Sequence, residues 1–118
     1  MTRVFDVDLL LGVPGPGGYA LLLTARVDLD LATEVAARRQ LGQVARSGAM
    51  AVVLDLTGVF IGVAVLRCLR DLAAGRDGAG LPIVTVGAPS WLTMSGLPPV
   101  PVADSVDGAV KALRAGYD

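Results

Sequence analysis

Several side chains in this 118-residue chain are of types that can do chemistry. Asp55 could act as a general base, and Cys68 could act as a nucleophile or a redox-active thiol. Asp28 and Asp30 could be ligands for a divalent cation, and the hydroxyl of Thr57 could accept a phosphate group. The chain has no histidine, which excludes Ser-His-Asp and Cys-His catalysis and removes the commonest transition-metal ligand.

Each of these candidates also has a structural interpretation, which we favour. Asp55 stands at the end of an apolar strand with no second titratable group nearby, so we expect its carboxylate to accept backbone N–H groups. Cys68 has no base to activate it and fits a small apolar helix residue. Two carboxylates are too few for Ca²⁺ or Mg²⁺, and Asp30 is a candidate helix cap. We therefore predict no catalytic residue, no metal site and no cofactor.

The composition narrows the possible partners and the compartment. A net charge of −1 and an aromatic content of 4% argue against a nucleic-acid surface or stacking platforms for bases. Mean hydropathy is +0.64, but the longest apolar tract, from about Ala49 to Leu66, contains Asp55 and fits a buried strand followed by a helix better than a membrane span. A lone cysteine and no visible signal peptide favour the cytoplasm.

Hydrophobic periodicity and turn signals predict the strands and helices that carry these residues. Predicted strands cover Val4–Leu10, Tyr19–Thr24, Ala51–Leu56 and Pro82–Val86, with a short edge strand within Pro98–Val102. Predicted helices cover Leu31–Arg46, capped by Asp30, and Gly62–Ala74, with one turn at Trp91–Ser95 and a last helix capped by Asp104.

This order predicts an α/β fold in one domain of residues 1–118. The first two strands are expected to form a hairpin around the turn cluster at 14–18, and the later strands, which alternate with helices, should run parallel. We expect a mixed sheet of four to five strands, covered by about four helices that lie mainly on one face.

Four segments, in this order, resemble the STAS domain of bacterial anti-sigma factor antagonists. They read Asp30-Leu31-Ala32-Thr33, Val52-Val53-Leu54-Asp55-Leu56-Thr57-Gly58-Val59, Gly87-Ala88-Pro89-Ser90 and Asp104-Ser105-Val106-Asp107-Gly108-Ala109-Val110. The resemblance covers nearly the whole chain. It implies a STAS fold and a partner that is an anti-sigma factor of the ATPase-kinase type.

The chain departs from the family at its functional motif. The family has Phe-Ile-Asp-Ser-Ser-Gly-Leu after the central strand, and a partner kinase phosphorylates the second serine. The matching stretch reads Phe60-Ile61-Gly62-Val63-Ala64-Val65-Leu66. A shift of register by one residue still places no Ser, Thr or Asp in the motif. The resemblance therefore puts Ala64 at the phospho-acceptor position, and Thr57 is interpreted as a turn threonine in preference to a surrogate acceptor.

Three consecutive apolar residues begin the helix after the central strand. Because neighbouring helical residues point about 100° apart, Val63, Ala64 and Val65 cannot all face inward. Two interpretations stay open: the turn is buried under the following loop, or it forms an apolar docking patch. The partner-binding residues that we predict are Asp28, Asp30, Thr57, Gly62, Val63, Ala64, Val65 and Leu66.

The function that we predict is docking without catalysis. The partner would be an anti-sigma factor or ATPase-type kinase, or another STAS protein, and a homodimer is possible; neither nucleic acid nor a membrane is expected. The alternative is a self-associating STAS scaffold or assembly subunit unrelated to sigma factor control. The hypothesis that we favour least is an enzyme that uses Asp55.

Overall fold

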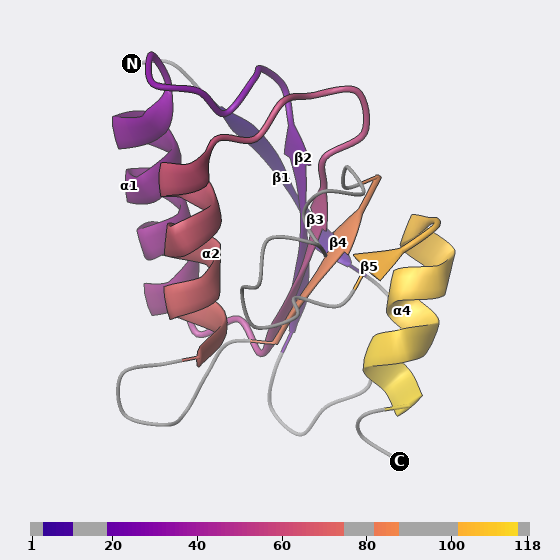
Figure 1. Ribbon diagram of the computed structural model, residues 1–118. Helices are drawn as coiled ribbons and strands as arrows, with labels where there is room; N and C mark the ends of the chain where they lie inside the picture. The colour runs from indigo at the N-terminus through magenta and orange to yellow at the C-terminus, as the bar shows by residue number, and fades with distance from the viewer. Residues whose placement is uncertain (1–3, 11–18, 75–81, 88–101, 116–118) are drawn as a thin grey trace.

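Five strands form one mixed sheet in the computed structural model, which describes residues 4–10, 19–74, 82–87 and 102–115. The strand order is β1-β2-β3-β4-β5, with β1 antiparallel to β2 and the other neighbours parallel (Figure 1). The strands are β1 (Phe5–Leu10), β2 (Ala20–Ala25), β3 (Ala51–Asp55), β4 (Ile83–Val86) and β5 (Val102–Ala103). The described helices are α1 (Glu34–Arg46), α2 (Val63–Ala74) and α4 (Val106–Ala115).

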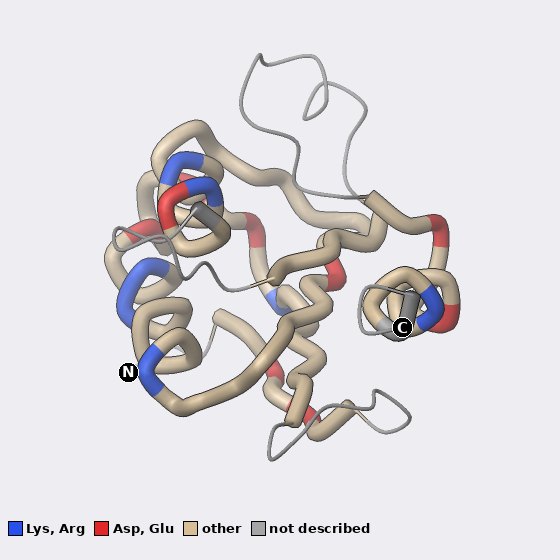
Figure 2. Tube along the Cα trace, turned by 90° about the horizontal axis from the view of Figure 1, so that it is seen from below, with Lys and Arg blue, Asp and Glu red and all other residues tan. Residues whose placement is uncertain are grey.

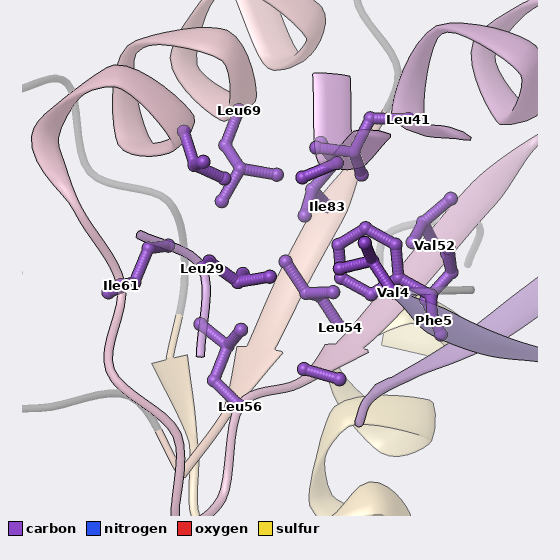
Figure 3. Close-up of a cluster of buried hydrophobic side chains, with 14 of the residues drawn as sticks. Val4, Phe5, Leu29, Leu41, Val52, Leu54, Leu56, Ile61, Leu69 and Ile83 are labelled. Carbon is purple, nitrogen blue, oxygen red and sulfur yellow. The ribbon is translucent and has the colours of Figure 1, made fainter. Parts of the chain in front are cut away.

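The described helices lie on both faces of the sheet. Helices α1 and α2 pack side by side on one face and α4 packs on the other (Figures 1 and 2). Strand β3 is apolar on both faces because it is covered on both. Val52 and Leu54 join the core under α1 and α2 (Figure 3), whereas Ala51 and Val53 join the core under α4. The predicted mixed α/β fold and central strand are confirmed.

Two helix starts differ from the predicted ones. Helix α1 begins at Glu34, three residues after the predicted start, because residues 31–33 form a separate turn. Asp30 Oδ1 accepts hydrogen bonds from the backbone N–H groups of Ala32 (3.0 Å) and Thr33 (3.3 Å), so it caps that turn and not the helix. At α4, Ser105 Oγ accepts the N–H of Gly108 at 3.0 Å, so the cap is Ser105 and not Asp104.

The strands and α2 lie within one residue of their predicted bounds wherever the structure describes them. The turn cluster at 14–18, the helical turn at 91–95 and most of the predicted edge strand at 98–102 lie outside the described residues. Within the described ranges, no helix combines the length and hydropathy that crossing a bilayer requires.

Candidate functional site

Two loops meet at the end of the sheet where β2 and β3 finish. Leu29, in the loop after β2, forms an isolated parallel bridge with Ile61, in the loop after β3. The Leu29 N–H donates to the carbonyl of Phe60, and the Gly62 N–H donates to the carbonyl of Leu29, each at 2.8 Å. The Asp28 carboxylate also accepts the Phe60 N–H at 2.9 Å. The two loops therefore form one hydrogen-bonded unit ahead of α1 and α2.

Burial and close packing hold this unit on the sheet. Leu29 and Ile61 are fully buried beside Leu56 at one end of the core under α1 and α2 (Figure 3). Gly62 lies so close to the other loop that a Cβ atom there would stand 3.2 Å from the Leu29 carbonyl oxygen. Glycine thus lets the start of α2 approach the loop after β2.

Exposed apolar side chains surround a pocket of about 730 Å³ on the outer side of this unit. Leu31 is 88% exposed, Phe60 54% and Val63 59%, and Ala64 is half-buried beside them. We call these four residues the apolar patch. Charged residues that also line the pocket are Asp30, Glu34 and Arg67. An apolar surface with a charged rim is typical of a protein interaction site.

The first turn of α2 divides its predicted site residues between surface and core. Val63 points to solvent, whereas Val65 and Leu66 are buried against the sheet. This follows from helix geometry, because each step of about 100° carries the side chain around the axis. The expectation that at least one of these apolar residues reaches the surface is confirmed. Val65 nevertheless lines the pocket, whereas Leu66 does not.

Asp55 and Thr57 have structural roles at the end of β3. Asp55 Oδ1 accepts the N–H of Thr57 at 3.0 Å, as predicted for a strand-end carboxylate. Thr57 is exposed and packs on Gly87, which has a φ of 69°. A Cβ atom at Gly87 would stand 2.8 Å from the Thr57 Cα, so only glycine fits there without a shift.

Asp28 and Asp30 each accept hydrogen bonds from backbone N–H groups. Asp28 is bonded to Phe60 in the facing loop, and Asp30 is bonded to the turn that precedes α1. Thr33 adds to this arrangement, because its hydroxyl donates to the Asp28 carbonyl at 2.6 Å and accepts the Asp30 N–H at 3.1 Å. Among the described residues, no three His, Cys, Asp or Glu side chains gather in one place.

Cys68 lies in α2 with its side chain partly covered. Burial raises the pKa of the Cys68 thiol above its ordinary value, and the nearby Arg38 guanidinium opposes this only in part. A thiol with a raised pKa is mostly protonated at neutral pH, which fits a packing role.

Two patch residues were missed by the sequence analysis. Leu31 was placed inside a helix, and Phe60 was treated only as part of the motif. The signal that could have found them is the occurrence of large apolar residues beside Asp30 and Gly62, in loops that follow two adjacent parallel strands. Such loops meet at the same edge of the sheet.

No family model matches the sequence, and no curated protein matches it. The fold is nevertheless shared with solved structures over nearly its full length, and it is that of a STAS domain, as predicted.

Two of these structures come from bacteria. RsbS of Moorella thermoacetica, in a serine-to-glutamate variant, superposes with a TM-score of 0.65 at 18% identity, over 94% of this chain and 97% of that one. An anti-sigma factor antagonist from Mycobacterium paratuberculosis superposes with a TM-score of 0.63 at 23% identity, over 92% and 95% of the two chains. At these identities the likeness concerns the fold.

Proposed function

We propose that the chain is a non-catalytic interaction domain that works as an anti-sigma factor antagonist in the bacterial cytoplasm. It acts as one domain of residues 1–118 and docks on an anti-sigma factor or ATPase-type kinase. The fold shared with two structures of that class supports the choice of partner. The observation that carries the proposal is the apolar patch, which stands at the start of α2, where the family resemblance puts the regulated motif.

The shape and chemistry of the patch support docking. Phe60 and Val63 are held in place by the bridge between the loops, so a partner meets a surface that is already ordered. A preorganised surface loses little conformational entropy on binding. Burial of exposed apolar area contributes about 25 cal/mol per Å², so a partner side chain that fills the pocket gains free energy without any covalent step.

The same site supports docking that phosphorylation does not reverse. A phosphate at the start of a helix would be held by the free N–H groups there and would repel an apolar partner. Ala64 has no hydroxyl to accept that phosphate, and Val63 has none either. Asp55 accepts the Thr57 N–H, the role expected for a strand-end carboxylate, which supports a function without catalysis.

Affinity capture with matched variants tests the docking surface. The bait would be the chain itself, as wild type, as Val63→Asp and as Val102→Asp. Val102 is a control of the same type, because it is 45% exposed in β5, the strand at one edge of the sheet, and does not line the pocket. The charge at Val63 should reduce capture of an anti-sigma factor or kinase at least tenfold, which corresponds to about 1.4 kcal/mol.

Each outcome has a defined meaning provided that both variants keep the circular dichroism spectrum of the wild type. Loss with Val63→Asp and retention with Val102→Asp would support docking at the patch. Equal capture by all three baits would refute it. Capture of only further copies of the chain would favour the alternative, a self-associating scaffold.

A further inference from the structure

The outer edge of β1 is a second surface that docking at the patch leaves unused. In the described sheet, β1 pairs along its six residues with β2 and has no strand on its other side. The opposite edge is β5, which is only two residues long and therefore offers little to an added strand. Val7 is 52% exposed and Leu9 61%, although both lie on the same face of the sheet as Phe5, which is buried in the core under α1 and α2.

The hydrogen-bond pattern identifies the backbone groups at this edge. The Arg26 N–H donates to the Val4 carbonyl at 2.9 Å. The backbone N–H and C=O groups of the even-numbered residues of β1 therefore point toward β2. In an antiparallel pair, hydrogen-bonded and non-hydrogen-bonded residues alternate. The N–H and C=O groups of Val7 and Leu9 therefore point away from β2, toward the free edge.

Helix α1 covers one end of the edge. Gln40 Oε1 accepts the N–H groups of Val4 and Phe5, each at 3.1 Å. Beyond Phe5, no described strand pairs with the outer edge of β1 at Val7 and Leu9. An extended segment laid along it would gain main-chain hydrogen bonds and would cover the two exposed apolar side chains.

The charged side chains of β1 indicate what kind of partner segment could bind along its edge. Asp6 and Asp8 alternate with Val7 and Leu9 and lie on the opposite face of the strand. Asp6 forms an ion pair with Arg26 at 3.2 Å, whereas Asp8 is exposed and has no ion pair with another described residue. One face of the edge is therefore apolar, and the other carries the Asp6–Arg26 pair and the carboxylate of Asp8.

A second copy of β1 is a poor partner for this edge. Two copies of β1 could pair edge to edge in an antiparallel arrangement. Two registers would pair most of the strand, one centred on Val7 and the other on Asp8. The first places Asp6 opposite Asp8 of the other copy, and the second places Asp8 opposite itself. Like charges directly opposite destabilise a strand pair, so self-pairing is disfavoured.

We propose that the β1 edge binds an extended segment of another protein in which apolar and basic side chains alternate. Its apolar residues cover Val7 and Leu9, and its lysine or arginine side chains pair with Asp8 and with the Asp6–Arg26 pair on the other face. This edge shares no residue with the apolar patch, and no residue of β1 lines the pocket, so the proposal does not depend on docking at the apolar patch.

The test uses a short capped peptide of alternating valine and lysine, with a valine–glutamate peptide as the charge control. Amide hydrogen exchange of the full chain would be followed by NMR. With the lysine peptide at about ten times its Kd, exchange of the Val7 and Leu9 amides should slow by about tenfold. The valine–glutamate peptide should leave both unchanged, and Asp8→Lys should invert the preference between the peptides.

The controls separate an edge effect from general electrostatics. Asp104→Lys makes the same charge change at an exposed residue before α4 and should behave as wild type. Asp8→Asn, a milder change, should weaken binding of the lysine peptide severalfold. The proposal is overturned if neither peptide slows exchange at Val7 and Leu9, if Asp8→Lys has no effect, or if the chain alone dimerises with both amides protected.

Discussion

At the scale of the residue, the first four positions of α2 include both buried and exposed apolar side chains. Val65 and Leu66 hold the helix on the sheet, while Val63 stands in solvent. The position that the resemblance assigns to a phosphorylated serine holds Ala64, a half-buried methyl group. Under the proposed function, a methyl group in place of a hydroxyl at this position leaves no acceptor for a phosphate. Ordinary helix geometry is enough to explain how one short apolar stretch does both.

Cys68 permits a prediction at the same scale. Because burial raises its pKa, the thiolate fraction at neutral pH is below that of a free cysteine. A disulfide reagent should therefore react more slowly with the native chain than with the chain in denaturant. The rate should increase as the pH rises toward the raised pKa.

Arg38→Ala provides the control for this prediction. The Arg38 charge lowers the Cys68 pKa and opposes the effect of burial, so its removal should slow the native reaction further. A native thiol that reacts as fast as the denatured one at neutral pH would contradict the packing role and would reopen the redox reading.

At the scale of the element, the link between the two loops positions the apolar patch. Asp28→Ala removes the acceptor of the Phe60 N–H and should lower the free energy of unfolding by about 1 kcal/mol. Asp28→Asn keeps a side-chain oxygen at the same place and should lose less. Urea denaturation of both variants checks the prediction, and if the alanine variant were as stable as wild type, this hydrogen bond would not hold the loops together.

Strands were easier to predict than helix starts, for a physical reason. Runs such as Ala51–Asp55 are apolar on both faces, and periodicity alone identifies them as covered strands. The start of α1 depends on which backbone groups form hydrogen bonds with the side chains of Asp30 and Thr33. The sequence is compatible both with a helix cap at Asp30 and with a separate turn before the helix. The choice is made by the facing loop, which also bonds to Asp28.

At the scale of the whole molecule, the fold could be predicted further than the site. The order of hairpin, helices and strands predicts a mixed α/β fold, and the resemblance of four short segments implies a STAS domain. Solved structures share that fold at 18% and 23% identity. The patch depends on contacts between loops that are about 30 residues apart, such as the bond from Phe60 to Asp28. No local sequence pattern predicts which apolar loop residues stay exposed after the two loops have packed together. Sequence analysis alone therefore does not identify Leu31 and Phe60 as patch residues.

Phosphorylation-independent docking is tested by capture of the partner in the presence of Mg²⁺ and ATP, after which the intact mass of the bait is measured. We expect an anti-sigma factor or ATPase-type kinase to stay bound and the mass of the chain to remain unchanged. A gain of one phosphate with release of the partner would contradict it, because a hydroxyl such as that of Thr57 would then serve as the switch that Ala64 cannot provide.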